Sequence, residues 1–359
     1  MKEGISEETF RAQQSEISQE YKRKLEEKET VINNLKKRFG KEQVFLDELK
    51  SCIEPVTPPK ISFEPKKKGE KVSSPCPLVL HSTDGHCGLK QPPEEVEGFN
   101  ETNFGIYQKR KLDFVKRALS FTDVMRFGYA INECHIIDTG DNISGDIHDE
   151  LKRTNEFPVP EQIIKAAETF AKQVMALAPH YNKIHVHWIT ADNHSRREKK
   201  PQSGEEGWNS DNYLVGYIAK LWLEKYENVQ FDLWLMHEKV ITVLNRNYLI
   251  FHGHGLPQNF GVPWYSIERK AGREAVARMQ EIMKMQEDME RRAREIGFNK
   301  MVFGHFHIKF DHPLYMCGPS LSGTDANDHK YGRHSVPGQR LWMVHPKHGE
   351  VNDNFISLT

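Results

Sequence analysis

Five short clusters of polar residues each follow an apolar run of the kind that forms a buried strand. They read Asp84-Gly85-His86, Gly140-Asp141-Asn142, Asp192-Asn193-His194, His252-Gly253-His254 and Gly304-His305-Phe306-His307. In layered α/β sheets the functional side chains lie beyond the carboxyl ends of the strands. We therefore expect the clusters to converge at one edge of the fold, although they are spread over residues 84–307.

Strand-like and helical runs alternate from Cys76 onward, and this alternation is typical of a layered α/β domain spanning 76–359. We predict helices at 104–122, 160–178, 211–225 and 266–296. We predict strands at 77–81, 134–137, 183–190, 231–236, 239–244, 248–251, 300–303, 313–317 and 340–345.

Two further segments precede this domain. Residues 1–54 are predicted to form a helical arm, because 5–50 are rich in Glu, Lys, Arg and Gln and contain no proline. Residues 55–75 are rich in proline and carry Lys66-Lys67-Lys68, which is the composition of a linker. The arm either pairs with a partner protein or a second copy, or lies against its own domain. The thin apolar stripe favours the second interpretation.

Composition excludes some classes of protein. Lys and Arg number 50 and Asp and Glu 51, so net charge argues neither for nor against nucleic-acid binding. The five cysteines form no Cys-x-x-Cys pair, which disfavours a zinc knuckle or disulfide framework and fits a reducing, cytoplasmic setting. No apolar stretch approaches the roughly 20 residues of a membrane span, so we expect no membrane association.

The clusters mix carboxylate, amide and imidazole groups, and this mixture suits paired divalent cations. Asp141 has two carboxylate oxygens and is the natural bridge between two ions, whereas Asp138 and Asp146 are expected in supporting or loop positions. Asn193 offers a neutral carbonyl oxygen, and His194 beside it can serve as a general acid. Cation pairs activate a shared water and polarise phosphoryl oxygens, so the clusters indicate cleavage of phosphate esters.

The series DGH, GDN, NH, HGH and GHFH resembles the five-motif signature of the calcineurin-like metallophosphoesterase superfamily, and its style is nearest to the repair-exonuclease type. The resemblance covers residues 76 to about 320 and implies a four-layer α/β/β/α sandwich with two divalent cations. Manganese is favoured, with iron, zinc or magnesium as alternatives. One cation would bind Asp84, His86, Asp141 and His307. The other would bind Asp141, Asn193, His252 and His305, and His194 would protonate the leaving oxygen.

Two positions depart from the family pattern. The third motif usually continues Gly-Asn-His with Asp or Glu, whereas Ser195 follows His194 here, so the acid that would orient this histidine is missing. The fourth motif offers both His252 and His254. We assign His252 as the ligand because it directly follows a strand, and we expect His254 to support the ligands from beside them.

Three classes of function fit these residues. The first is a phosphodiesterase or nuclease acting on nucleic acid, and local basic residues favour it. These are Arg196–Lys200, the Lys66 triplet, and Arg269, Lys270, Arg273 and Arg278. Arg196 and Arg197 would either clamp a phosphate oxygen or form an exposed basic loop. Segment 198–247 is expected to set substrate choice.

The second class is a phosphomonoesterase or a small-molecule phosphodiesterase. The stretch GDNISGDIHDE lacks the Arg that protein phosphatases of this superfamily usually place there, which counts against that activity. The third class is a non-catalytic protein that keeps the metal-binding fold and docks in an assembly through its helical arm.

Overall fold

The computed structural model describes residues 57–60, 74–200, 204, 206–257, 262–285 and 288–359. The predicted helical arm and most of the predicted linker, including the Lys66 triplet, lie outside these residues. Among the residues described, no helix combines the length and apolar character needed to cross a bilayer.

A six-stranded sheet forms one half of the core. Its order is β13 (Gly349–Ser357), β12 (Gly338–His345), β2 (Leu78–Ser82), β4 (Glu133–Asp138), β5 (Lys183–Ile189) and β6 (Val229–Trp234). Strands β2, β4, β5 and β6 run parallel, with Leu80 opposite Ile136 and Ile136 opposite Val186. Their carboxyl ends therefore share one edge, and β12 closes the other side antiparallel to β2.

A five-stranded sheet forms the other half. Its order is β10 (Phe310–His312), β11 (Tyr315–Cys317), β9 (Lys300–Phe303), β8 (Arg246–Phe251) and β7 (Glu238–Val243). Strands β8, β9 and β11 are parallel, so the segments after β8 and β9 leave the sheet at the same edge. A short parallel pair, β1 (Ser74–Pro75) and β3 (Tyr129–Ala130), lies outside both sheets.

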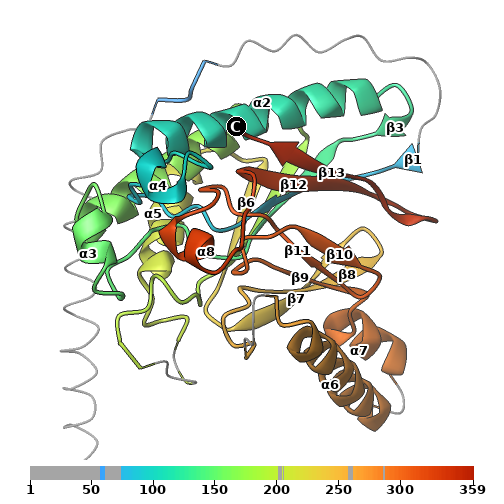
Figure 1. The fold of residues 1–359 in the computed structure, drawn as a ribbon. Coiled ribbons are helices and arrows are strands. Elements are labelled where there is room, and N and C mark those ends of the chain that lie inside the picture. The colour runs from blue at the N-terminus through green and yellow to red at the C-terminus, as the bar shows by residue number, and fades with distance from the viewer. Residues whose placement is uncertain (1–56, 61–73, 201–203, 205, 258–261, 286–287) are drawn as a thin grey trace, which may run out of the picture. The chain divides into compact units, whose positions relative to one another are not determined.

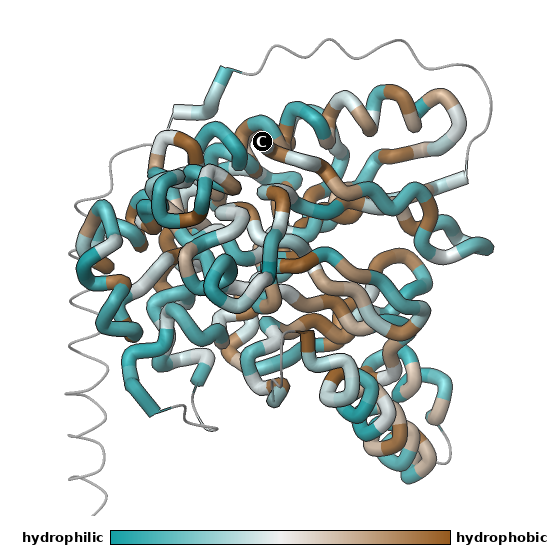
Figure 2. Tube along the Cα trace, in the orientation of Figure 1, coloured by the Kyte–Doolittle hydropathy of each residue, from teal (hydrophilic) through white to brown (hydrophobic). Residues whose placement is uncertain are grey.

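The two sheets pack face to face through a buried apolar core. Val79 and Ile137 of the six-stranded sheet share this core with Ile250 and Val302 of the five-stranded sheet. Figure 2 shows apolar residues gathered along the strands. Alternate residues of each strand face inward, which explains how short β-branched runs build a dry interface.

Helices cover the outer faces of both sheets (Figure 1). The six-stranded sheet carries α2 (Phe104–Met125), α4 (Val159–Leu177) and α5 (Asp211–Leu223). On that side the ring of Phe170 meets Trp188 edge to face at 4.8 Å between centroids. The five-stranded sheet carries α6 (Trp264–Lys284), whose Ile267 packs with Leu249 and Met301. The layers therefore run α/β/β/α.

The long helix predicted at 266–296 is wrong, because the structure has two helices there. Helix α6 ends at Lys284, Met285 has non-helical dihedrals (φ −96°, ψ 67°), and α7 spans Met289–Ile296. Several short elements escaped the sequence pattern as well. They are the strands β1, β3, β10 and β13, the helices α3 (Leu151–Thr154) and α8 (Ala326–Lys330), and the 3₁₀ turns Pro93–Val96 and Ala178–His180.

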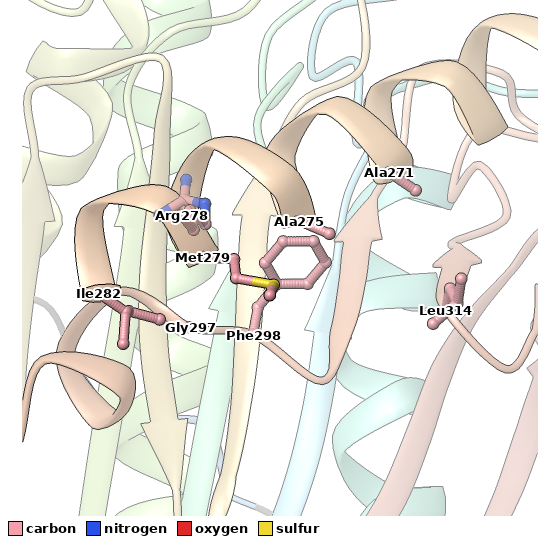
Figure 3. Close-up of a pocket in the computed structure, with 8 residues that line it drawn as sticks. All are labelled: Ala271, Ala275, Arg278, Met279, Ile282, Gly297, Phe298 and Leu314. Atoms are coloured by element: carbon pink, nitrogen blue, oxygen red, sulfur yellow. The ribbon is translucent and has the colours of Figure 1, made fainter. Parts of the chain in front are cut away.

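One face of α6 borders a small apolar groove of about 180 Å³. Figure 3 shows Met279 of α6 beside Phe298 in this groove, with Leu314 across from the helix. Two basic residues of α6, Lys270 and Arg278, are bound to Glu238 at 2.6 and 2.9 Å. Both cations therefore share one carboxylate, and their contact with phosphate stays a prediction.

Candidate metal centre

The seven predicted ligands meet at one edge of the two-sheet core, just beyond the carboxyl ends of strands from both sheets. Segments after β2, β4 and β5 supply Asp84, His86, Asp141 and Asn193, and segments after β8 and β9 supply His252, His305 and His307. Parallel strands explain this convergence, because each segment leaves its sheet on the same side.

The first group of donors is Asp84, His86 and His307, which approach one another closely enough to share one cation. The Nε2 atoms of His86 and His307 are 3.1 Å apart, and His307 Nε2 lies 3.7 Å from an Asp84 oxygen. The separation of these two imidazole nitrogens is that of neighbouring ligands on one cation.

The second group is Asp141, Asn193, His252 and His305. His252 Nε2 lies 3.0 Å from Asp141 Oδ2 and 2.9 Å from Asn193 Oδ1, and His305 completes the cluster. Asp141 also lies within ligand distance of His86 and His194, so its carboxylate stands between the two groups. This is the bridging position that the sequence predicts for it.

These spacings fit a pair of divalent cations. Two donors bound to one ion at 2.0–2.1 Å lie about 2.8–3.4 Å apart, for bond angles between octahedral and tetrahedral. The closest donor–donor distances in both groups are 2.9–3.1 Å. The mixture of imidazole, amide and carboxylate donors suits Mn²⁺, Fe²⁺ or Zn²⁺.

The ligand rings are fixed by bonds to their other nitrogens. His252 Nδ1 donates to the Thr139 carbonyl at 2.8 Å, and His307 Nδ1 donates to Asp328 Oδ2 at 2.5 Å. Each bond places the ring proton on Nδ1 and leaves Nε2 free to bind a metal. Asp328 is almost fully buried on α8 and also forms an ion pair with Arg333 at 3.0 Å. Sequence reasoning missed Asp328, because no motif marks its position.

Histidine rings and carboxylates lie next to one another in the centre and shift each other's pKa. Burial lowers the pKa of His252 and His307, but Asp141 beside the first and Asp328 beside the second outweigh it and raise each pKa to about 10. Burial also opposes ionisation of Asp141, yet His252 and His194 hold its pKa well below the usual range. The positive charge of the imidazolium groups thus offsets the negative charge of the carboxylates. Bound divalent cations would take the place of the protons on these rings.

Glycines allow the close approach of these segments. Gly140 has φ +101°, and a Cβ there would lie 2.9 Å from the Cβ of Asp192. Gly304 has no space at all, since a Cβ would overlap Thr83 Oγ1 and Asp84 Oδ2. Gly140 is therefore required by packing and by its positive φ, and Gly304 by packing alone.

His194 is oriented without the missing acid. Its Nδ1 donates to the Ser144 carbonyl at 2.7 Å, and its ring meets His86 at 4.5 Å between centroids. The carboxylate of Asp192 instead accepts from the backbone N–H groups of Asp141 and Ser195 at 3.0 and 2.7 Å. Asp192 therefore braces the turn that carries Asn193 and His194, and it is not held by Arg196 or Arg197.

The two candidate phosphate-binding arginines differ in their surroundings. Arg197 Nε is bound to Asp211 at 2.8 Å, and its contact with a phosphate oxygen stays a prediction. Arg196 Nη1 donates to the Asn193 carbonyl at 2.8 Å and lines the cleft above the centre. This cleft measures about 800 Å³ and is also bordered by His194, His254 and Arg333.

His254 does not contact the ligand nitrogens directly. Its Nε2 lies 2.7 Å from Glu206 Oε1, and its ring stands 5.5 Å from the ring of His252. Asp138 accepts from Asn142 and Gly140 and so supports its own turn, while Asp146 is exposed.

Comparison with known proteins gives distant likenesses only. No family model matches this sequence, and no curated protein matches it either. A zinc complex of Vps29 from Entamoeba histolytica is similar with TM-score 0.26 and 12% identity, over 79% of this chain and 99% of that one.

Two further solved structures show the same level of likeness. A predicted phosphoesterase from Streptococcus pneumoniae has TM-score 0.28 and 9% identity, over 79% of this chain and 98% of that one. A putative 5′-nucleotidase from Staphylococcus aureus has TM-score 0.31 and 7% identity, over 79% of this chain and 54% of that one. Such scores bear on neither substrate nor partner, so the site is interpreted from its own geometry.

Proposed function

We propose that this chain, which has the fold of the calcineurin-like metallophosphoesterase superfamily, hydrolyses phosphodiester bonds in nucleic acid with two divalent cations. The observation that carries the proposal is the convergence of seven donors, Asp141 among them, in overlapping groups at one edge of the fold. A purely structural role would not require so many buried ionisable groups to share one edge.

The residues divide the work of hydrolysis. When bound, a pair of divalent cations supplies Lewis acidity towards phosphoryl oxygens and lowers the pKa of a shared water. The Ser144 carbonyl fixes Nδ1 of His194, so Nε2 is the atom that can hold a proton for the leaving oxygen. Asp192 braces the turn that holds Asn193 and His194 at a constant separation. Arg196, held by the Asn193 carbonyl, adds a positive charge to the cleft wall.

A phosphodiester suits this cleft better than a phosphomonoester. Residues 140–150 contain no arginine to bind the extra charge of a monoester dianion, and they instead carry Asp146, Asp149 and Glu150. An open cleft of about 800 Å³ also has room for groups on both sides of a scissile bond. Nucleic acid is the diester we favour, because Arg196 lines the cleft and two more cations follow it in the sequence, Lys199, which pairs with Asp149 at 3.1 Å, and Lys200.

The test uses model esters and two variants. With Mn²⁺ present, we expect hydrolysis of bis-p-nitrophenyl phosphate and of single-stranded or duplex DNA, with little turnover of p-nitrophenyl phosphate. Asp141→Ala should abolish both metal loading and activity. His194→Ala should lower kcat by about 10²–10⁴ while metal loading is kept. Preference for the monoester would indicate a phosphomonoesterase, and a metal-loaded protein without turnover would indicate a binding role.

A further inference from the structure

A second cluster of metal-binding side chains lies beside the centre. Glu206, His237 and His254, here called the Glu206 triad, come from the loop before α5, the turn between β6 and β7, and the loop after β8. His254 Nε2 lies 2.7 Å from Glu206 Oε1, and His237 Nδ1 lies 2.9 Å from Glu206 Oε2. The two rings meet edge to face with 5.0 Å between centroids.

We propose that the Glu206 triad binds a third divalent cation at the rim of the cleft. Two histidines and one glutamate form a donor set that holds zinc at sites with an open coordination position. The nitrogen–oxygen contacts of 2.7 and 2.9 Å are close to the separation of neighbouring ligands on one ion, and a small outward movement would admit a cation.

The position of the triad gives such a cation access to the substrate. The side chain of His254 is 9% exposed and lines the cleft, with its ring 6.4 Å from that of His305. The side chain of His237 is 38% exposed, so solvent also reaches the triad at this residue. The cation would therefore have protein ligands on one side and open positions for water or an anion on the other.

Charge in the cleft gives the third cation a role. The described lining includes the carboxylates Asp141, Glu150 and Asp325, and its arginines are Arg196 and Arg333. A doubly charged ion at the triad would shift this balance towards positive and provide an anchor for a polyanion. The site rests on the triad alone and does not depend on the reaction proposed above, but it would strengthen binding of a nucleic-acid substrate.

The competing arrangement is a triad held only by hydrogen bonds, with both histidines donating to Glu206. The two arrangements respond differently to Glu206→Gln. The glutamine amide can accept from one histidine through its oxygen and donate to the other through its NH2 group, but it is a much poorer ligand, so this change removes the cation while keeping a hydrogen bond to each ring.

The experiment counts metal in the full-length chain. The protein is stripped with a chelator, reloaded with excess Zn²⁺, desalted and analysed for metal. Parallel samples of the stripped protein are loaded with Co²⁺ in place of Zn²⁺ for visible absorption. We expect three ions per chain in the parent protein and two in both His237→Ala and Glu206→Gln. Part of the Co²⁺ absorption should disappear in the variants. His348→Ala, which removes an exposed histidine of another region, should keep all three.

Two other outcomes are informative. Two ions in the parent protein, unchanged in His237→Ala and Glu206→Gln, would overturn the third site and leave the cation pair intact. Asp141→Ala separates the two proposals, because it should remove the pair and spare the triad. If Asp141→Ala kept its full metal content, the cation pair would be wrong while the result for the triad would still stand.

Discussion

At the scale of single residues, the predicted ligands combine backbone strain with metal-binding chemistry. Asp84, His86, Asp141, His305 and His307 all have left-handed φ, between 48° and 70°. Each such residue costs of order 1 kcal/mol or more and persists only where its surroundings hold it. Asp84 supplies part of that hold by accepting from the backbone N–H of His305 at 3.0 Å. Hydrogen bonds of this kind therefore help to pre-position the donors for metal binding.

Asp328 is the residue that tests this pre-positioning. We expect Asp328→Asn to weaken metal binding by about 10–100-fold, because His307 would lose the carboxylate that fixes its ring and raises its basicity. Calorimetric titration with Mn²⁺ measures the effect. Asp311→Asn, which alters the ion pairs of a half-exposed carboxylate with Lys300 and Arg340, is the matched control. Unchanged affinity in Asp328→Asn would show that the ring is held without it.

At the scale of elements, the site depends on how closely the segments after β2 and β9 approach. We expect Gly304→Ala to reduce the free energy of unfolding by roughly 1–3 kcal/mol and to impair metal binding, because the new methyl group meets Thr83 and Asp84. Gly272→Ala is the control, since this α6 glycine has nothing within 4 Å. It should be neutral or stabilise the helix by about 0.5–1 kcal/mol. Equal effects of the two changes in denaturant unfolding would contradict the packing argument.

The same elements show what the sequence can predict. The strands before the clusters, such as β2 and β9, were found because each is a continuous apolar run ending in polar residues. Strand β13 (GEVNDNFIS) was missed because it lies at a sheet edge and is mostly half-buried, so its pattern is weak. The break between α6 and α7 was missed because neither proline nor glycine marks it.

The site likewise contains some residues that the sequence predicts and others that it does not. All seven candidate ligands lie together in the fold, and their role in binding metal stays a prediction that metal analysis must test. Glu206, His237 and Asp328 could not be assigned from sequence, because single polar residues in loops have no spacing that distinguishes them from solvent-exposed ones. Their contacts depend on tertiary packing, which brings α8 and segment 198–247 to the ends of the strands.

At the scale of the whole molecule, buried neutral histidines link stability to pH. His187 on β5 stacks with His185 and His135, and the three rings are nearly parallel. Burial lowers the pKa of His187 to about 4, although Asp232 opposes the shift. Burial and Arg340 lower the pKa of His81 to about 3. In the unfolded chain both rings bind a proton near pH 6.5.

The unfolded state therefore binds more protons than the folded state between about pH 6.5 and 4, and stability is lost as pH falls through that window. For each such histidine the loss approaches about 1.4 kcal/mol per pH unit. We expect the free energy of unfolding to fall less steeply between pH 6.5 and 5 in His187→Gln than in the parent protein, because glutamine does not titrate. The difference in slope should correspond to at most one proton taken up on unfolding. Urea unfolding at several pH values measures this slope, with His348→Gln as an exposed control. An identical slope in His187→Gln and the parent protein would mean that the His187 ring is already protonated in the folded state. The positive charge of that ring would then have to be offset by a nearby carboxylate such as that of Asp232.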